Sequence, residues 1–290
     1  MTPSSSPQIK LALPKGRMEK GVFDLMQAAG IQIRAGSRTY RPIVSLPEFE
    51  AKILKPRDIV EMLHLGSRDV GFAGADWVAE LGVEIVELLD TGLDPVKLVA
   101  AAPTAFLENG KLPERAFVVA SEYERLTRAW IERRGYQATF VRANGATEVF
   151  PPEDADCIVD NTASGATLRA NQLEIVDELL YSSTRLYANV WALEDKNKRT
   201  KIEHLVLLLR SVIEARKRVM LEVNVTTENF DALIAILPCM REPTIAPLHG
   251  NSGFALKAAV PRSDLPRLIP AIKNCGGTDI VVSELSQIVP

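Results

Sequence analysis

The sequence predicts an α/β protein built from two α/β lobes and a small C-terminal domain. Strands alternate with helices from residue 9 onward, and the same alternation restarts near residue 116. From residue 219 the order becomes βαββαβ, the split βαβ of ferredoxin-like folds. We therefore expect a first lobe of residues 1–100 and 183–217, a second lobe of residues 101–182, and a ferredoxin-like domain of residues 218–290.

The first lobe begins with a strand, because Ile9–Leu13 alternates in polarity until Pro14. A helix whose apolar face repeats every three to four residues follows and ends at Gly30. After it, Asp76 is predicted to cap the third helix of the lobe with its side chain. The elements between are the strand Phe49–Ile53, a short helix opened by Pro56, and the apolar strand Val70–Ala73.

The second lobe repeats this rhythm and is inserted into the first. Its predicted strands are Ala116–Ala120, Ala138–Val141 and Cys157–Val159, with a helix over Glu122–Arg134. The chain is expected to return to the first lobe through two strand-like stretches, Glu174–Leu180 and Thr184–Trp191, and a long helix over about Asp195–Lys217.

The C-terminal domain occupies roughly the last 70 residues, which is enough for a small separate domain. Its predicted strands are Leu221–Val225, Thr244–Leu248, Phe254–Val260 and Asp279–Val282. Its predicted helices are Glu228–Leu237 and Ser263–Asn274.

Composition and charge exclude several classes of protein. The formal net charge of −3 argues against the basic surface of a nucleic-acid-binding protein. Met1–Pro7 lacks the pattern of a signal peptide, and the longest apolar run, Leu205–Leu209, is far shorter than the roughly 20 residues that cross a bilayer. Scattered cysteines and histidines argue against a disulfide framework or a zinc site. We expect a cytoplasmic protein without nucleic-acid or membrane partners.

The segment Asp160–Leu168 carries the most chemical information. It follows a buried strand and precedes a helical turn, so its backbone N–H groups point outward where a helix begins and can bind a phosphate. Gly165 lets an anion approach the main chain, and the hydroxyl groups of the segment add donors. Asp160, at the strand end, is placed to accept hydrogen bonds from ribose hydroxyls. A capped loop of small polar residues explains the same spacing about equally well.

Three further segments fall at strand ends, where ligands of open α/β sheets bind. They are Lys15-Gly16-Arg17, Lys55–Asp58 and Asp69–Gly74. The basic residues of the first segment supply charge for a polyanion, although solvated side chains explain them as well. Tight packing of a buried strand is an equally good explanation of Gly71 and Gly74.

Taken together, these segments resemble the ATP phosphoribosyltransferase family in its long form. Asp160–Leu168 is similar to the family's phosphoribosyl-pyrophosphate loop, Asp-x-Val-Ser-Thr-Gly-x-Thr-Leu, with Ser164 replacing the first threonine and Thr162-Ala163 replacing Val-Ser. Asn144–Glu148 resembles the family's Asp-Gly-x-x-Glu segment, and Glu148 matches its acidic residue. Pro151-Pro152 replaces a stretch that is usually helical in the family.

The remaining segments match the family in the same order along the chain. Lys15-Gly16-Arg17 resembles its Lys/Ser-Gly-Arg turn, Lys55–Ile59 its Arg-Pro-x-Asp-Ile, and Asp69–Asp76 its Asp-Leu-Gly-Ile-Thr-Gly-x-Asp. In the last domain, Glu242–Leu248 resembles the long form's Pro-Thr-Ile-x-Pro-Leu signature. The resemblance covers nearly the whole chain.

The resemblance implies a pentosyltransferase that joins ATP to 5-phosphoribosyl 1-pyrophosphate, releasing phosphoribosyl-ATP and pyrophosphate in the first step of histidine biosynthesis. It implies Mg²⁺ held through the substrate pyrophosphate, with unknown protein ligands. Histidine is expected to inhibit through the C-terminal domain, where Thr244 is the first candidate contact. The chain is expected to form homo-oligomers, from dimers to hexamers.

The same resemblance assigns roles to residues. Asp160, Lys15 and Arg17 are expected to be catalytic, with Asp160 on the ribose and Ser164–Thr167 on the 5-phosphate. Lys15, Arg17 and Lys55 are expected to hold the pyrophosphate or the ATP phosphates. The other expected substrate contacts are Gly16, Asp69, Gly74, Glu148, Asn161, Thr162, Ala163, Ser164, Gly165, Ala166 and Thr167.

Two alternatives share these features. A bilobal solute-binding protein of the periplasmic-binding-protein type has the same two-lobe architecture, and a fold does not by itself imply a function. A catalytically silent homologue that acts only as a regulator is the second alternative. The lack of a recognisable signal peptide and the appended domain favour the enzyme.

Overall fold

A computed structural model describes residues 8–34 and 40–289. The chain divides into two compact units. The first unit extends to Glu203 without Ala28–Gly30, and the second comprises Ala28–Gly30 and the chain from His204 onward.

A sheet with the strand order β4-β1-β5-β10-β6-β9-β7-β8 runs through the first unit. Each end of the sheet is a group of parallel strands, as the sequence predicts for the two lobes. The first group is β1 (Ile9–Pro14), β4 (Phe49–Leu54) and β5 (Val70–Gly74). The second group is β7 (Phe117–Ser121), β8 (Ala138–Arg142) and β9 (Cys157–Thr162).

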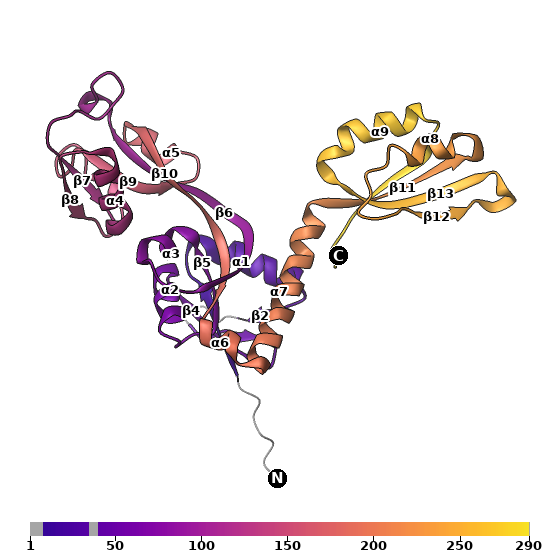
Figure 1. Cartoon of the computed structure of the whole chain (residues 1–290), viewed down its shortest axis with the longest axis horizontal. Coiled ribbons are helices and arrows are strands. Elements are labelled where there is room, and N and C mark those ends of the chain that lie inside the picture. Colours follow the sequence, from indigo (N-terminus) through magenta and orange to yellow (C-terminus); the bar gives the residue numbers. More distant parts are fainter. Residues whose placement is uncertain (1–7, 35–39, 290) are drawn as a thin grey trace, which may run out of the picture. The chain divides into compact units, whose positions relative to one another are not determined.

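Two long antiparallel strands, β6 (Val86–Pro103) and β10 (Leu173–Ala188), join these groups (Figure 1). The sequence pattern does not indicate β6, and the prediction of two strands, Glu174–Leu180 and Thr184–Trp191, is wrong. β10 is one strand, and Trp191 lies in α6 (Val190–Glu194). The register between β6 and β10 shifts at several bulges. Bulges interrupt the alternation of polar and apolar residues by which a strand is recognised.

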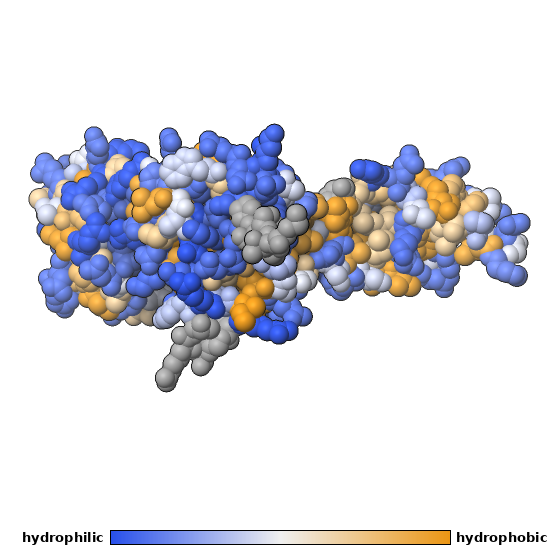
Figure 2. Space-filling model, turned by 90° about the horizontal axis from the view of Figure 1, so that it is seen from below, coloured by the Kyte–Doolittle hydropathy of each residue, from blue (hydrophilic) through white to orange (hydrophobic). Residues whose placement is uncertain are grey.

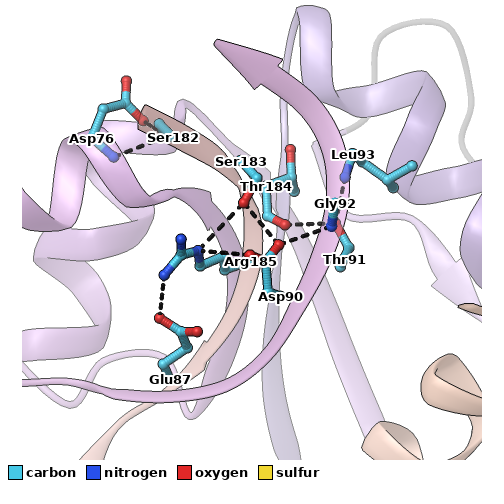
Figure 3. Close-up of polar contacts among 10 residues, drawn as sticks. All are labelled: Asp76, Glu87, Asp90, Thr91, Gly92, Leu93, Ser182, Ser183, Thr184 and Arg185. Atoms are coloured by element: carbon cyan, nitrogen blue, oxygen red, sulfur yellow. Dashed lines mark hydrogen bonds and ion pairs between the residues drawn. The ribbon is translucent and has the colours of Figure 1, made fainter. Parts of the chain in front are cut away.

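Polar side chains stabilise the bulged part of this strand pair (Figure 3). Thr91 Oγ1 donates to the Thr184 carbonyl at 2.5 Å, and Ser183 Oγ donates to Asp90 Oδ1 at 2.7 Å. Arg185 forms ion pairs with Glu87 at 2.7 Å and with Asp90 at 3.4 Å. Side-chain hydrogen bonds thus replace regular ladder contacts where the chain passes from one lobe to the other.

The helices of the first unit cover the parallel strands. They are α1 (Arg17–Ala28), α2 (Pro56–His64), α3 (Ala75–Leu81), α4 (Glu124–Arg134), α5 (Ala166–Ala170) and α6, with a small hairpin of β2 (Ile33–Arg34) and β3 (Ile43–Val44). The prediction that Asp76 caps α3 is wrong. Gly74 holds the cap position, and Asp76 lies buried in the first turn, where its carboxylate accepts hydrogen bonds from other elements.

The C-terminal unit contains the predicted ferredoxin-like sheet, with the order β12-β13-β11-β14 and antiparallel pairing throughout. Leu233, Leu268 and Ile272 of its two helices pack on the alternating apolar residues of β11. The strands are β11 (Arg218–Thr226), β12 (Thr244–Pro247), β13 (Gly253–Pro261) and β14 (Thr278–Glu284), and the helices are α8 (Phe230–Ile234) and α9 (Leu265–Asn274). The predicted long helix is α7 (Lys196–Arg216), which contributes residues to both units.

The α/β class and the ferredoxin-like order predicted from the sequence are confirmed, while the lobe boundaries stay predictions. Hydrophilic residues cover most of the face of the first unit that is seen in Figure 2, with separate apolar patches between them. No helix of the described residues combines the length and apolar character that spanning a membrane requires.

Candidate active site

The predicted phosphate loop is a tight connection between β9 and α5. β9 continues to Thr162, so Asp160–Thr162 is strand, and Ala163–Gly165 alone makes the turn. Thr162 Oγ1 accepts a hydrogen bond from the Gly165 N–H at 2.9 Å, and this contact closes the turn. The first N–H groups of α5 have no partner within the helix and can bind an anion.

Gly165 is required for its backbone conformation. Its φ of +72° lies in the left-handed region, where a Cβ is strained. A Cβ would come within 2.8 Å of Arg169 Nη1, but that atom ends a flexible side chain that can move away. The backbone angle is therefore one observed reason for glycine, and the sequence interpretation that glycine also makes room for an anion stays a prediction.

Asp160 is a half-buried carboxylate at the end of β9. Burial raises its pKa to about 6, and the nearby carboxylates of Glu148 and Glu122 add to the rise. The Asn161 N–H, which donates to Asp160 Oδ1 at 2.7 Å, lowers the pKa in part. At neutral pH the group is therefore mostly ionised, and it can accept hydrogen bonds from hydroxyl groups.

A pocket of about 300 Å³ opens beside this carboxylate. It brings Arg17 and Glu148 together with the loop, so a cation from the first lobe faces the anion-binding turn of the second. The pocket is lined by Arg17, Glu148, Asp160, Asn161, Thr162, Ala163, Ser164, Ala166, Thr167 and Leu168.

A second pocket of about 460 Å³ is lined by residues of both lobes. It contains Lys55, which the sequence predicted, and also Arg57, Trp77 and Arg142, which were not included in the predicted site. Arg142 is the last residue of β8, so the rule that ligands bind at the carboxyl ends of strands could have identified it.

Lys15 lies at the expected turn but lines neither of these pockets. Its Nζ donates to Tyr40 Oη at 3.2 Å and lies 5.0 Å from the centre of the Tyr40 ring. Gly16 has a φ of +82°, which lets the chain turn between Lys15 and Arg17.

The structure places Asp69 and Gly74 in supporting positions. Asp69 is at the amino end of β5, where its carboxylate accepts from the Lys10 N–H at 2.7 Å and pairs with Lys198 at 2.8 Å. Gly74 is packed so closely that a Cβ would lie 2.1 Å from Asp76 Oδ1. Tight packing of a buried strand, the alternative raised by the sequence, accounts for Gly74.

Asn161 lines the pocket and also contacts the buried core. Its Nδ2 donates to the buried Tyr123 hydroxyl at 2.9 Å, and that hydroxyl donates to Asp76 Oδ2 at 2.6 Å. These contacts join residues that are 38 and 47 positions apart, so no local pattern in the sequence indicates them.

Two further predicted features concern histidine and metal. Thr244 opens β12, an exposed edge strand of the C-terminal sheet. Among the described residues, no three His, Cys, Asp or Glu side chains gather as a protein-built metal cage would require.

Comparison with known families identifies the chain. The sequence model of the family described as ATP phosphoribosyltransferase matches residues 55–211, and the one described as "HisG, C-terminal domain" matches residues 215–287. Relatives named ATP phosphoribosyltransferase are 33% identical in Pelotomaculum thermopropionicum, over 98% of this chain and 100% of theirs, and 35% identical in Solibacter usitatus, over 97% and 99%.

A solved structure is also similar. It is titled as an ATP phosphoribosyl transferase (HisG:HisZ) complex from Thermotoga maritima, with a TM-score of 0.63 and 27% identity. The match covers 71% of this chain and 99% of that one.

The fold and these matches define an α/β transferase with an appended C-terminal domain. The chain belongs to the ATP phosphoribosyltransferase family, and it is therefore a pentosyltransferase.

Proposed function

We propose that this enzyme joins ATP to 5-phosphoribosyl 1-pyrophosphate as the first step of histidine biosynthesis in the cytoplasm. In this reaction N1 of adenine attacks the anomeric carbon, a C–N bond forms, and the C–O bond to pyrophosphate breaks. The transition state resembles an oxocarbenium ion, so positioning and charge neutralisation supply most of the acceleration.

The observation that carries the proposal is the pocket that Asp160 and Arg17 share with Ala163, Ser164 and Ala166 of the β9–α5 connection. A phosphorylated sugar needs a carboxylate for its hydroxyls, N–H donors for its phosphate and a cation for its pyrophosphate. We assign Asp160 to the ribose, Ser164–Thr167 to the 5-phosphate and Arg17 to the pyrophosphate.

The second pocket suits ATP. Lys55, Arg57 and Arg142 supply positive charge for a triphosphate, and Trp77 supplies an aromatic ring for contact with adenine. The Glu122 carboxylate also lines this pocket and affects Asp160 electrostatically, which supports a position of this pocket near the first one.

Mg²⁺ is proposed to enter with the substrate, where it neutralises the pyrophosphate leaving group. Asp160 and Glu148, which share a pocket, are the oxygen donors best placed to approach such an ion. Lys15 is also proposed to contact the pyrophosphate, which requires its Nζ to leave the Tyr40 hydroxyl.

Histidine is proposed to inhibit the enzyme from the C-terminal domain, with Thr244 as the first candidate contact. Exposed edge strands such as β12 pair readily across subunits, which supports a homo-oligomer, up to a hexamer, with the inhibitor site at a subunit contact.

The test is to mix the purified protein with ATP, 5-phosphoribosyl 1-pyrophosphate and Mg²⁺ and to measure product absorbance and released pyrophosphate. Formation of both products in a one-to-one ratio is expected. Binding of either substrate without turnover would instead support the solute-binding or the silent regulatory alternative.

A further inference from the structure

We propose that Tyr123 is a positioning residue for this reaction: its hydroxyl, anchored on Asp76 of the first lobe, holds Asn161 and thereby the strand that carries Asp160. The inference rests on the proposed function, since it gives Tyr123 a task only if Asp160 contacts the ribose.

Tyr123 is fully buried just before α4, and its ring stacks on Trp77 with the ring centroids 4.7 Å apart. Its hydroxyl donates to Asp76 Oδ2 at 2.6 Å and accepts from Asn161 Nδ2 at 2.9 Å. Burial first, and then Asp76, raises the pKa of Tyr123 above its ordinary value. The hydroxyl therefore stays protonated and keeps donating to Asp76.

Both neighbours of Asp160 on β9 are tied to Tyr123. Side chains alternate along a strand, so Asn161 points to the face opposite Asp160 and reaches the Tyr123 hydroxyl. On the other side, Ser121 Oγ donates to the Val159 carbonyl at 2.6 Å, and Ser121 Oγ also accepts from the Tyr123 N–H at 2.9 Å. These contacts fix the backbone on each side of Asp160, and the Asn161 N–H in turn holds the Asp160 carboxylate.

The anchor of this chain of contacts is itself firmly held. Asp76 is 3% exposed and accepts from Ser182 Oγ at 2.7 Å (Figure 3). Among the described residues, Asp76 forms no salt bridge. Its carboxylate accepts from the hydroxyl groups of Tyr123 and Ser182, so removal of the Tyr123 hydroxyl leaves one oxygen of this buried group without that donor.

A second carboxylate on α3 reinforces the same junction. Glu80, one turn after Asp76, accepts from the backbone N–H groups of Arg125 and Leu126, each at 3.0 Å. These are N–H groups of the first turn of α4, which have no partner inside that helix. α3 of the first lobe thus fixes the start of α4, and Tyr123 with it.

The test is Tyr123→Phe, which keeps the ring and its stacking on Trp77. We expect kcat/KM for 5-phosphoribosyl 1-pyrophosphate to fall roughly tenfold, with KM for ATP unchanged, because the hydroxyl loses its hydrogen bonds with both Asp76 and Asn161. Tyr136→Phe is the matched control, since the Tyr136 ring packs in the same core against Trp130 and Phe117. Its kinetics should match the wild type.

A double-mutant cycle tests whether Tyr123 affects the reaction through Asn161. If Tyr123 acts through Asn161, then Asn161→Ala also lowers kcat/KM for 5-phosphoribosyl 1-pyrophosphate and leaves KM for ATP unchanged. The double variant then loses no more kcat/KM than the more affected single variant. Additive losses, or equal effects on both substrates, would overturn the inference. Should Tyr123→Phe fail to fold, Asn161→Ala alone decides, because unchanged kinetics there contradict the inference directly.

Failure of the proposed function is distinguishable from failure of this inference. A wild-type protein that makes no phosphoribosyl-ATP overturns the proposed function and this inference together. An active wild type whose Tyr123→Phe variant has unchanged constants overturns the inference alone.

Discussion

At the scale of single residues, the partners of a carboxylate separate the group proposed for chemistry from the group that holds the fold. Asp160 is desolvated and has a raised pKa of about 6, with two other carboxylates near it. Asp69 is buried too, but its oxygens are occupied by Lys198 and a backbone N–H. The first is placed for a ligand, and the second stabilises the amino end of β5.

Replacing Asp160 should therefore separate stability from activity. Because its folded pKa of about 6 lies above the ordinary value near 4, the native state binds more protons between these pH values, and stability falls as the pH rises through that window. At pH 7, Asp160→Asn should raise the free energy of unfolding by on the order of 1–3 kcal/mol. It should also lower kcat/KM about ten- to a hundredfold. Chemical denaturation and steady-state kinetics measure the two effects; a less stable variant would show that the carboxylate is not desolvated.

The pH dependence of the wild type follows from the same group. The ionised form accepts from ribose hydroxyls, so kcat/KM for 5-phosphoribosyl 1-pyrophosphate should decline as the pH falls through about 6. Rates at saturating ATP across this range measure the acid limb. Asp160→Asn should lack this limb, and persistence of the limb in that variant would assign it to another group.

Replacing Asp69 should lower the stability and leave the kinetic constants unchanged. Asp69→Ala leaves the partly buried Lys198 ammonium and the Lys10 N–H without their partner, which should cost about 1–3 kcal/mol of folding free energy. The folded fraction should keep wild-type KM values, as measured by thermal unfolding and kinetics on the same sample. A specific rise in KM for either substrate would return Asp69 to the site.

At the scale of elements, the turn between β9 and α5 depends on one backbone angle. Gly165→Ala strains that turn, and so does Gly135→Ala at the end of α4, where φ is +70° and the space is open. Each should lose about 1 kcal/mol of stability. Gly165→Ala alone should raise KM for 5-phosphoribosyl 1-pyrophosphate more than KM for ATP. Similar constants for the two variants would make the turn purely structural.

Elements were predictable where their signals are local. The strand before Asp160, the capping Gly135 and the βαββαβ order of the last domain depend on short-range periodicity and turn residues. β6 was missed because its bulges break that periodicity. The contacts that link Asp76, Tyr123 and Asn161 join distant segments, which a single sequence does not record.

At the scale of the whole molecule, the two compact units suggest separate catalytic and regulatory tasks. Histidine should inhibit without competing with 5-phosphoribosyl 1-pyrophosphate, because coupling between distinct sites need not exclude the substrate. The part of α7 from His204 onward belongs to the second compact unit, and a cut near Val219 would remove the rest of that unit. A point variant is therefore the cleaner test. Thr244→Val should weaken histidine binding about tenfold in calorimetry, with catalysis intact.

Thr278→Val, on the opposite edge strand of the same sheet, is the matched control for this experiment. It should leave histidine binding unchanged. Undiminished binding to Thr244→Val, or competition of histidine with 5-phosphoribosyl 1-pyrophosphate, would place the sensor elsewhere.

The most direct measurement of the central claim is the rate of phosphoribosyl-ATP formation by the wild type and by Asp160→Ala, side by side, with ATP, 5-phosphoribosyl 1-pyrophosphate and Mg²⁺. The account predicts a wild type that releases one pyrophosphate per product. It predicts a folded variant about ten- to a hundredfold slower, since a charge-assisted contact with the ribose is lost. Equal rates in the two proteins, or no product from the wild type, would contradict it.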